Sequence, residues 1–120
     1  MTIQRWPSSG PGRSHTVAHQ ALVWTVANAR NLQGGFAQQV LETFRVLDAA
    51  LLAANSCKER LLSVQVVLAN IADRAAFDAL WCEWLGPNPA HWPQRAVYGA
   101  ALAPGLLVEL IVTAAQNPGE

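Results

Sequence analysis

The chain has 120 residues, of which 52% are hydrophobic and 13% are charged, and eight basic side chains balance eight acidic ones. This length suits one domain with its own core and excludes two. A net charge of zero argues against nucleic-acid binding through a basic field. Soluble domains usually carry about 25% charged residues. Because this chain carries only 13%, we expect apolar patches on its surface, and we expect self-association to bury them.

The chain shows no signal for secretion, membrane insertion or metal binding. Its N-terminal segment, MTIQRWPSSGPG, lacks the apolar core of a signal peptide, and no apolar run is long enough to cross a bilayer without interruption. Cys57 and Cys82 follow no metal-ligand spacing and are typical of reduced thiols. His15, His19 and His91 form no HxH or helical HxxxH pair, which favours surface histidines over a metal site. We therefore expect a cytoplasmic protein with no cofactor, membrane contact or nucleic-acid partner.

The first half of the chain predicts strands followed by a helix. Residues 2–6 alternate weakly before the turn-rich stretch PSSGPG. β-branched and aromatic residues then favour strands over residues 14–19 and 21–27, joined as a hairpin or meander. After the loop NARNLQGG, apolar residues recur every three or four positions from residue 36 to residue 54, which predicts an amphipathic helix.

The second half predicts a strand, a helix and two more strands. Residues 59–70 alternate, and one face of this strand is wholly apolar. The side chains expected on that face are Leu62, Val64, Val66 and Leu68. Asp73 begins a second helix, which Gly86-Pro87 ends. Its expected buried stripe contains Ala76, Phe77, Leu80, Trp81 and Trp84. The last strands are expected over residues 96–102 and 106–115, joined by a proline-glycine turn.

The element order is therefore β-β-β-α-β-α-β-β. It predicts an α+β fold in which a mixed six-stranded sheet carries both helices on one face. No predicted element remains to cover the opposite face, so we expect one sheet to pack against another by self-association. We assign residues 1–120 to one domain, with residues 1–13 as an N-terminal strand and turn and residues 116–120 as a tail.

Arg95 and Glu109 are the charged residues of the apolar stretch from Gln94 to Ala115. A buried unpaired carboxylate is costly, so Glu109 needs a partner, an exposed face or a function. Alternation places it with Ile111 and Thr113 on the more polar face of the last strand, which we expect to meet a subunit interface. Arg95 could bind a carboxylate through two N–H donors, and Glu109 could accept a proton from a water molecule. Equally, the two could form an ion pair with each other or with a neighbouring chain.

The C-terminal half resembles the Rid family (reactive intermediate deaminases, also called YjgF-type). The resemblance is carried by LLSVQVVLANIADRAAFDALWCEWL, a proline-bearing loop and QRAVYGAALAPGLLVELIVTAA. The helix FAQQVLETFRVLDAALLAANS is similar to the family's first helix, so the resemblance covers about residues 17–115. The residues that match family motifs are Val67 to Asp73, Phe77, Trp81, Pro93 to Arg95, and Pro104 to Leu110.

This resemblance implies a chorismate-mutase-like fold and a homotrimer with clefts between subunits. It implies that Arg95 grips a substrate carboxylate and that Glu109 positions a water molecule. The implied reaction converts 2-imino or enamino acids, such as 2-iminopropanoate or 2-iminobutanoate, into 2-oxo acids and ammonia. Val26 and Ala27 stand where active members carry a pocket-lining Ser-Gly or Thr-Gly dipeptide. Trp92, in the loop beside Arg95, could line the cleft or cap the core, and the same alternatives apply to Tyr98.

Two classes of function stay open at this point. The first is hydrolytic deamination, and the second is a trimer that binds a small carboxylate metabolite through Arg95 without catalysis. A ribonuclease is disfavoured by the zero net charge and by the lack of a basic stripe interleaved with aromatic residues. Besides Val26 and Ala27, the chain departs from the family at Asn70, where an aspartate is usual, and at Ala79 or a neighbour, where an asparagine is usual. These departures indicate a pocket reshaped for another ligand or one that has lost the reaction.

Overall fold

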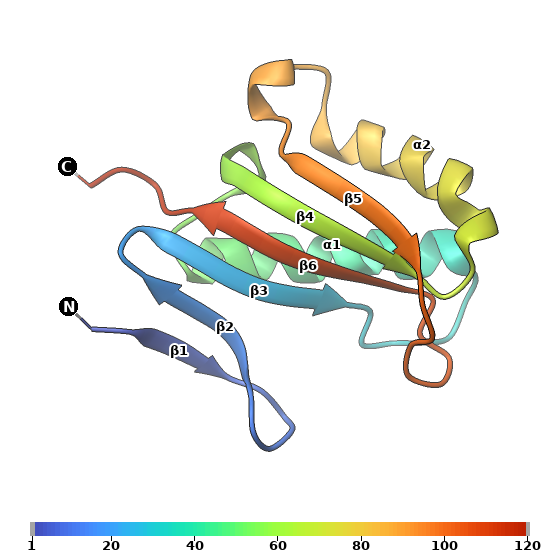
Figure 1. The fold of residues 1–120 in the computed structure, drawn as a ribbon, viewed down its shortest axis with the longest axis horizontal. Helices are drawn as coiled ribbons and strands as arrows, with labels where there is room; N and C mark the ends of the chain where they lie inside the picture. The colour runs from blue at the N-terminus through green and yellow to red at the C-terminus, as the bar shows by residue number, and fades with distance from the viewer. Residues whose placement is uncertain (1, 120) are drawn as a thin grey trace.

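The computed structural model describes residues 2–119, and its element order is the predicted one (Figure 1). The strands are β1 (Gln4–Pro7), β2 (Ser14–His19), β3 (Leu22–Asn28), β4 (Leu61–Leu68), β5 (Gln94–Gly99) and β6 (Val108–Ala115). The helices are α1 (Phe36–Ala53) and α2 (Arg74–Leu85), and short 3-10 turns cover Lys58–Arg60, Ile71–Asp73 and Pro89–His91. Met1 and Glu120, the ends of the predicted domain, lie outside the described residues.

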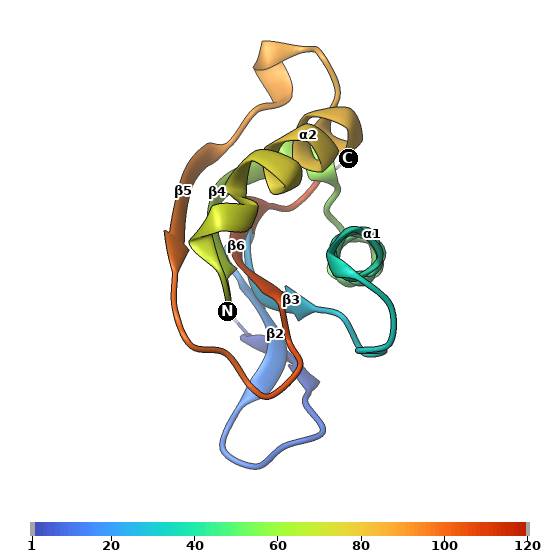
Figure 2. The same ribbon diagram turned by 90° about the vertical axis from the view of Figure 1, so that its right-hand side faces the viewer.

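All six strands form one mixed sheet in the order β1-β2-β3-β6-β4-β5. β4 and β5 run parallel because the chain crosses over through α2 between them, while the other neighbouring pairs are antiparallel. Figure 2 shows both helices on the same side of the sheet, which confirms the predicted α+β architecture. We call the side without helices the open face. Within residues 2–119, no helix is long and apolar enough to span a membrane.

α1 forms because its apolar residues share one side of the helix. Val40, Phe44, Leu47 and Leu51 are all fully or almost fully buried against the sheet. The helix ends where Asn55 adopts a left-handed conformation with φ of 61°. The next amide, of Ser56, donates to the carbonyl of Leu51 at 2.8 Å, and Asn55 donates to Leu52 at 3.1 Å, which is the Schellman pattern of helix termination.

Aromatic rings join the two helices. Phe44 of α1 stacks on Trp84 of α2 with ring centroids 4.5 Å apart, and it meets Phe77 edge-on at 6.0 Å. The indole N–H of Trp84 donates to the carboxylate of Asp48 at 3.2 Å. Trp81 and Trp84 were predicted to be core residues, and the structure confirms this, since Trp81 is buried and Trp84 packs against the core.

Two predicted core positions are wrong. Leu62 is 47% exposed because the pairing of β4 with β6 shifts between Leu61 and Ser63, so that Leu61 enters the core instead. Ala76 is exposed because the buried side of α2 runs through Phe77, Trp81 and Leu85.

The open face carries a group of large apolar side chains. Trp24 and Val26 of β3, Ile111 of β6 and Tyr98 of β5 are each between 36% and 41% exposed. Val26 and Ile111 are register partners, so they lie side by side on this face. An exposed apolar sheet face of this kind fits the expected self-association.

Candidate functional site

Arg95 lies on β5 and points toward the helices. Its register partner on β4 is Val64, which is buried in the core, and paired residues on neighbouring strands share a face. The guanidinium carbon lies 5.4 Å from the ring centroid of Trp81 and 5.9 Å from that of Phe77. Its Nη2 atom lies 2.7 Å from Oδ1 of Asp78. Thus α2 provides both an aromatic surface and a negative partner for this cation.

Asp78 bridges two arginines. Its other oxygen, Oδ2, lies 3.8 Å from Nε of Arg74 one turn earlier on α2. The side chain of Arg95 is 19% exposed and that of Asp78 is 38% exposed. Among residues 2–119, Nε and Nη1 of Arg95 have no hydrogen-bond or ion-pair partner, so they remain available for a second acceptor.

Glu109 lies on β6 and points to the open face. Its register partners are Asn28 on β3 and Val67 on β4. The side-chain amide of Asn28 donates to Glu109 Oε1 at 3.1 Å. Glu109 is partly buried, and the ion pairs among residues 2–119 do not include it. Its second oxygen is therefore available for a water molecule or a ligand.

Arg95 and Glu109 thus occupy opposite faces of one sheet. Residues on the same strand as Glu109 show the alternation directly, because Val108 and Leu110 are buried under the helices. The alternative in which Arg95 and Glu109 pair with each other is excluded within one chain. A site that uses both side chains requires two copies of the protein.

A cleft opens beside Glu109 where β2 separates from β3. The two strands are paired only as far as Thr16 and Thr25, while β3 stays paired to β6 up to Asn28. Figure 1 shows β1 and β2 turning away from β3 toward the tip of their hairpin. The resulting cleft has a volume of about 770 Å³. Its lining includes Trp6, Ser14, His15, Val26, Asn28, Arg30 and Glu109.

His15 stands at the edge of this cleft in a ring of hydrogen bonds. Its Nδ1 lies 2.8 Å from the hydroxyl oxygen of Thr16. That oxygen lies 2.8 Å from the hydroxyl oxygen of Thr25. The Thr25 hydroxyl in turn donates to the backbone carbonyl of His15 at 3.3 Å. Since each hydroxyl has one proton, this arrangement assigns the proton to Nδ1 and leaves Nε2 as an acceptor. Burial, followed by the positive charge of Arg30, lowers the pKa of His15 from its ordinary value of 6.5. The ring is therefore neutral at pH 7.

The family model described as endoribonuclease L-PSP matches residues 18–116 of the chain. The chain belongs to the Rid family, also called the YjgF family. A RutC family protein from Haemophilus ducreyi is 41% identical over 81 residues, which cover 67% of this chain and 68% of that protein. Among solved structures, a YjgF family member from Neisseria meningitidis has a TM-score of 0.87 at 25% identity, with 99% and 98% of the two chains covered. A protein from Pseudomonas aeruginosa has a TM-score of 0.87 at 27% identity, with 97% and 100% covered.

The dipeptide expected to line the Rid pocket divides between the two faces. Val26 projects onto the open face and lines the cleft with Glu109. Ala27 is fully buried under the helices, and its register partner is Leu110 of the core. Only the backbone of Ala27 can therefore approach a ligand on the open face.

Trp92 and Tyr98 also lie on separate parts of this Rid-family chain. Trp92 is exposed in the loop before β5, and its indole N–H donates to the carbonyl of Gly86 at 2.9 Å. It caps the end of α2 rather than the core. Tyr98 lies on the open face and donates to Gln65 at 3.2 Å. Its register partner Val67 is also the partner of Glu109, so Tyr98 and Glu109 flank the same residue.

Sequence reasoning missed Asn28, Arg30 and Asp78 as neighbours of the site. Asp78 is a neighbour of Ala79 on α2, where the usual asparagine of the family was expected to be replaced at Ala79 or beside it. Asn28 directly follows the Val26-Ala27 pair, but only the register of β3 against β6 places it opposite Glu109. Within residues 2–119, no three His, Cys, Asp or Glu side chains are grouped to hold a metal ion.

Proposed function

We propose that this Rid-family protein is a homotrimer that hydrolyses small 2-imino or enamino acids in pockets between its subunits. Each pocket takes Arg95 from one copy and Glu109 from the next. The observation that carries the proposal is the placement of these two side chains on opposite faces of one sheet. The apolar open face that bears Glu109 supports it, because this face requires a partner surface.

The residues suit the chemistry of imine hydrolysis. The free N–H donors of Arg95 bind the substrate carboxylate and orient the imine carbon. Oε2 of Glu109 accepts a proton from water as the water oxygen bonds to that carbon, while Asn28 holds Oε1. Glu109 then gives this proton to the imine nitrogen, which forms a carbinolamine. In a second transfer the hydroxyl proton passes through Glu109 to the amino nitrogen while the C–N bond breaks, so that ammonia leaves and the C=O bond of the 2-oxo acid forms. Val26, the backbone of Ala27, Trp92 and Tyr98 are proposed to surround the bound substrate.

Ammonia release from freshly generated 2-iminopropanoate tests this proposal. The imine is made in situ with an amino-acid oxidase, and its decay is compared for the natural protein, Arg95→Ala and Glu109→Gln. We expect acceleration by the natural protein and none by either variant. Light scattering coupled to size exclusion checks that the variants keep the same assembly.

Mixing the two inactive variants tests the shared pocket. After co-refolding in equal amounts, about a quarter of the pockets in a cyclic trimer combine an intact Arg95 with an intact Glu109. We expect about a quarter of the natural activity to return. No recovery in mixed trimers of confirmed composition would show that the two residues do not act across an interface.

The alternative is a trimer that binds a small carboxylate without catalysis. One observation favours it, since Val26 lines the cleft with Glu109 and supplies no hydroxyl donor where active members carry Ser-Gly or Thr-Gly. No acceleration for any imine, together with calorimetric binding of 2-oxo acids that Arg95→Ala abolishes, would establish this alternative.

A further inference from the structure

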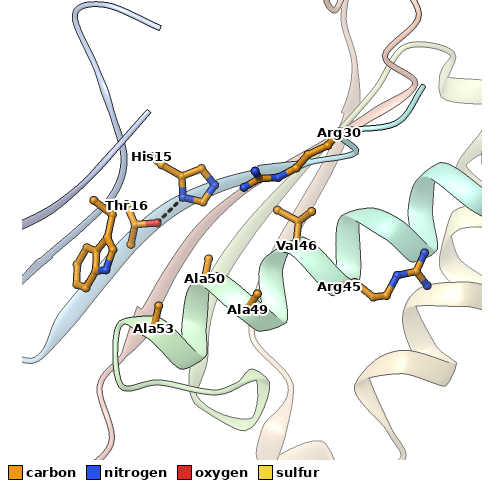
Figure 3. Close-up of a pocket in the computed structure, with 9 residues that line it drawn as sticks. His15, Thr16, Arg30, Arg45, Val46, Ala49, Ala50 and Ala53 are labelled. Carbon is orange, nitrogen blue, oxygen red and sulfur yellow. Dashed lines mark hydrogen bonds between the residues drawn. The ribbon is translucent and has the colours of Figure 1, made fainter. Parts of the chain in front are cut away.

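A second cleft lies on the helix side of the sheet, between α1 and the β1–β2 hairpin. It has a volume of about 380 Å³. Figure 3 shows Val46, Ala49, Ala50 and Ala53 of α1 along one wall, facing Thr16 and His15 on β2. Trp6 of β1 is also part of its lining. The walls are thus mostly apolar, and the alanines leave room for a flat group.

The two clefts form one continuous space. Trp6, His15, Arg30 and Val46 line both of them. The continuity arises because β2 is paired with β3 only from Thr16 onward, so the sheet has an opening beside Ser14 and His15. The space therefore extends from Glu109 on the open face, through the opening, to α1 on the helix face.

Arg30 controls the charge at this opening. Figure 3 shows its guanidinium extending from the end of β3 toward His15. Arg30 makes no ion pair among residues 2–119, and the nearby carboxylate of Glu42 binds the backbone amides of Arg30 and Asn31 instead. A cation at a narrow opening attracts the face of an aromatic ring and repels a cationic side chain.

We infer that the cleft along α1 is the side-chain subsite of the proposed pocket and that it takes an aromatic side chain. This inference rests on the proposed function for the position of the reacting carbon near Glu109. With the reacting carbon near Glu109, an aromatic side chain lies beyond Arg30 and packs between Trp6 and the alanines of α1, whereas a methyl group leaves the cleft empty. In the proposed trimer the open face is covered by other copies, so the helix side remains the route of access for such a ligand.

Binding of 2-oxo acids tests the inference without requiring turnover. The natural protein is titrated by calorimetry with 2-oxo-3-phenylpropanoate and with 2-oxopropanoate. We expect the phenyl compound to bind about ten- to a hundredfold more tightly, from the apolar area that its ring buries. Ala50→Leu fills the cleft and should remove most of this preference while leaving the binding of 2-oxopropanoate unchanged. Ala37→Leu, the same change at an exposed position of α1, should alter neither.

Two further variants keep the test decisive if Ala50→Leu does not fold. Ala53→Leu narrows the same cleft from an exposed position, and Arg30→Gln removes the cation at the opening. Ala53→Leu should weaken the phenyl compound selectively. Arg30→Gln also removes a cation from the cleft beside Glu109, so it should weaken both acids, and the phenyl compound by the larger factor. Equal affinities for the two acids, no effect of any cleft variant, or tighter binding of 2-oxopentanedioate than of the phenyl compound would overturn the inference.

The outcomes for the subsite and for the reaction are separable. Imine hydrolysis with no aromatic preference would leave the proposed function intact and overturn the subsite. Selective binding of the phenyl compound with no imine hydrolysis would support the subsite and overturn the deaminase.

Discussion

We expect Asp78 to compete with a ligand carboxylate for Arg95, and we expect its replacement by asparagine to remove that competition. In the present arrangement Asp78 Oδ1 lies 2.7 Å from Nη2 of Arg95, while Nε and Nη1 stay free. A carboxylate on those free donors would lie about 5 Å from the Asp78 carboxylate. At that distance, with an effective dielectric between that of water and that of a protein surface, the repulsion is about 1 to 2 kcal/mol. The 38% exposure of Asp78 keeps the value in this low range.

We therefore expect Asp78→Asn to tighten the binding of 2-oxo acids by about five- to thirtyfold. The asparagine keeps the size of the side chain and can still contact Arg95, so the guanidinium should stay over the rings of Phe77 and Trp81. In the hydrolysis assay the change should appear as a lower KM with little change in kcat. Added salt should reduce the difference between the two proteins, because it screens the repulsion.

Two variants of α2 serve as controls for this prediction. Glu83→Gln makes the same change in charge at an exposed position of the same helix and should leave the affinity unchanged. Arg74→Gln removes the second partner of Asp78, which lies at 3.8 Å, and should weaken carboxylate binding. A loss of affinity in Asp78→Asn would refute the reasoning, since it would show that Asp78 positions Arg95 instead of competing for it.

Three further predictions concern stability and are measured by urea unfolding. Gln39→Leu should lower the free energy of unfolding by about 2 to 4 kcal/mol, because it leaves two backbone groups of the β5–β6 loop unpaired. The side-chain amide of Gln39 donates to the carbonyl of Gly105, and its side-chain oxygen accepts from the amide of Leu107. An unchanged unfolding midpoint would mean that water replaces both bonds. Ala21→Gly should stabilise the protein by about 0.5 to 1 kcal/mol, because Ala21 has φ of 69° in the β2–β3 turn, whereas Ala37→Gly in α1 should destabilise it. His15→Gln should flatten the loss of stability as the pH falls below 6.5, since the lowered pKa of His15 means that the unfolded chain binds a proton that the folded chain does not. An equally steep loss in that variant would assign the acid sensitivity to other groups.

Periodicity was sufficient to predict the order of elements because each buried stripe repeats a simple spacing. The helix from Phe36 and the alternation around Glu109 appear in the structure as the pattern predicts. Strand ends were less predictable because side chains from elsewhere in the chain determine them. The last strand was expected from residue 106 but begins at Val108, since Gln39 binds the backbone at Gly105 and Leu107 in place of a neighbouring strand.

The predicted start of the fifth strand was wrong by two residues, and this error concealed the geometry of the site. The fifth strand was predicted over residues 96–102, which left Arg95 in a loop with no assigned face. In the structure β5 begins at Gln94, so Arg95 belongs to the strand and points toward α2. The register of β5 against β4 therefore decides that Arg95 and Glu109 lie on opposite faces, and local sequence patterns do not contain that register.

The position of Glu109 on the open face connects the proposed assembly with the proposed reaction, because covering that face would bury its carboxylate. If other copies cover the open face, this carboxylate loses water, and an uncompensated buried charge costs several kcal/mol. The bond from Asn28 offsets about 1.5 to 3 kcal/mol of that cost, as is usual for hydrogen bonds to charged groups. The remainder requires a cation or retained water at the interface. Arg30 lines the same cleft, and the proposed trimer brings Arg95 of a neighbouring copy to it. Glu109 is thus tolerable at an interface only where the interface keeps a hydrated, cation-lined pocket, which is what hydrolysis of a charged imino acid requires.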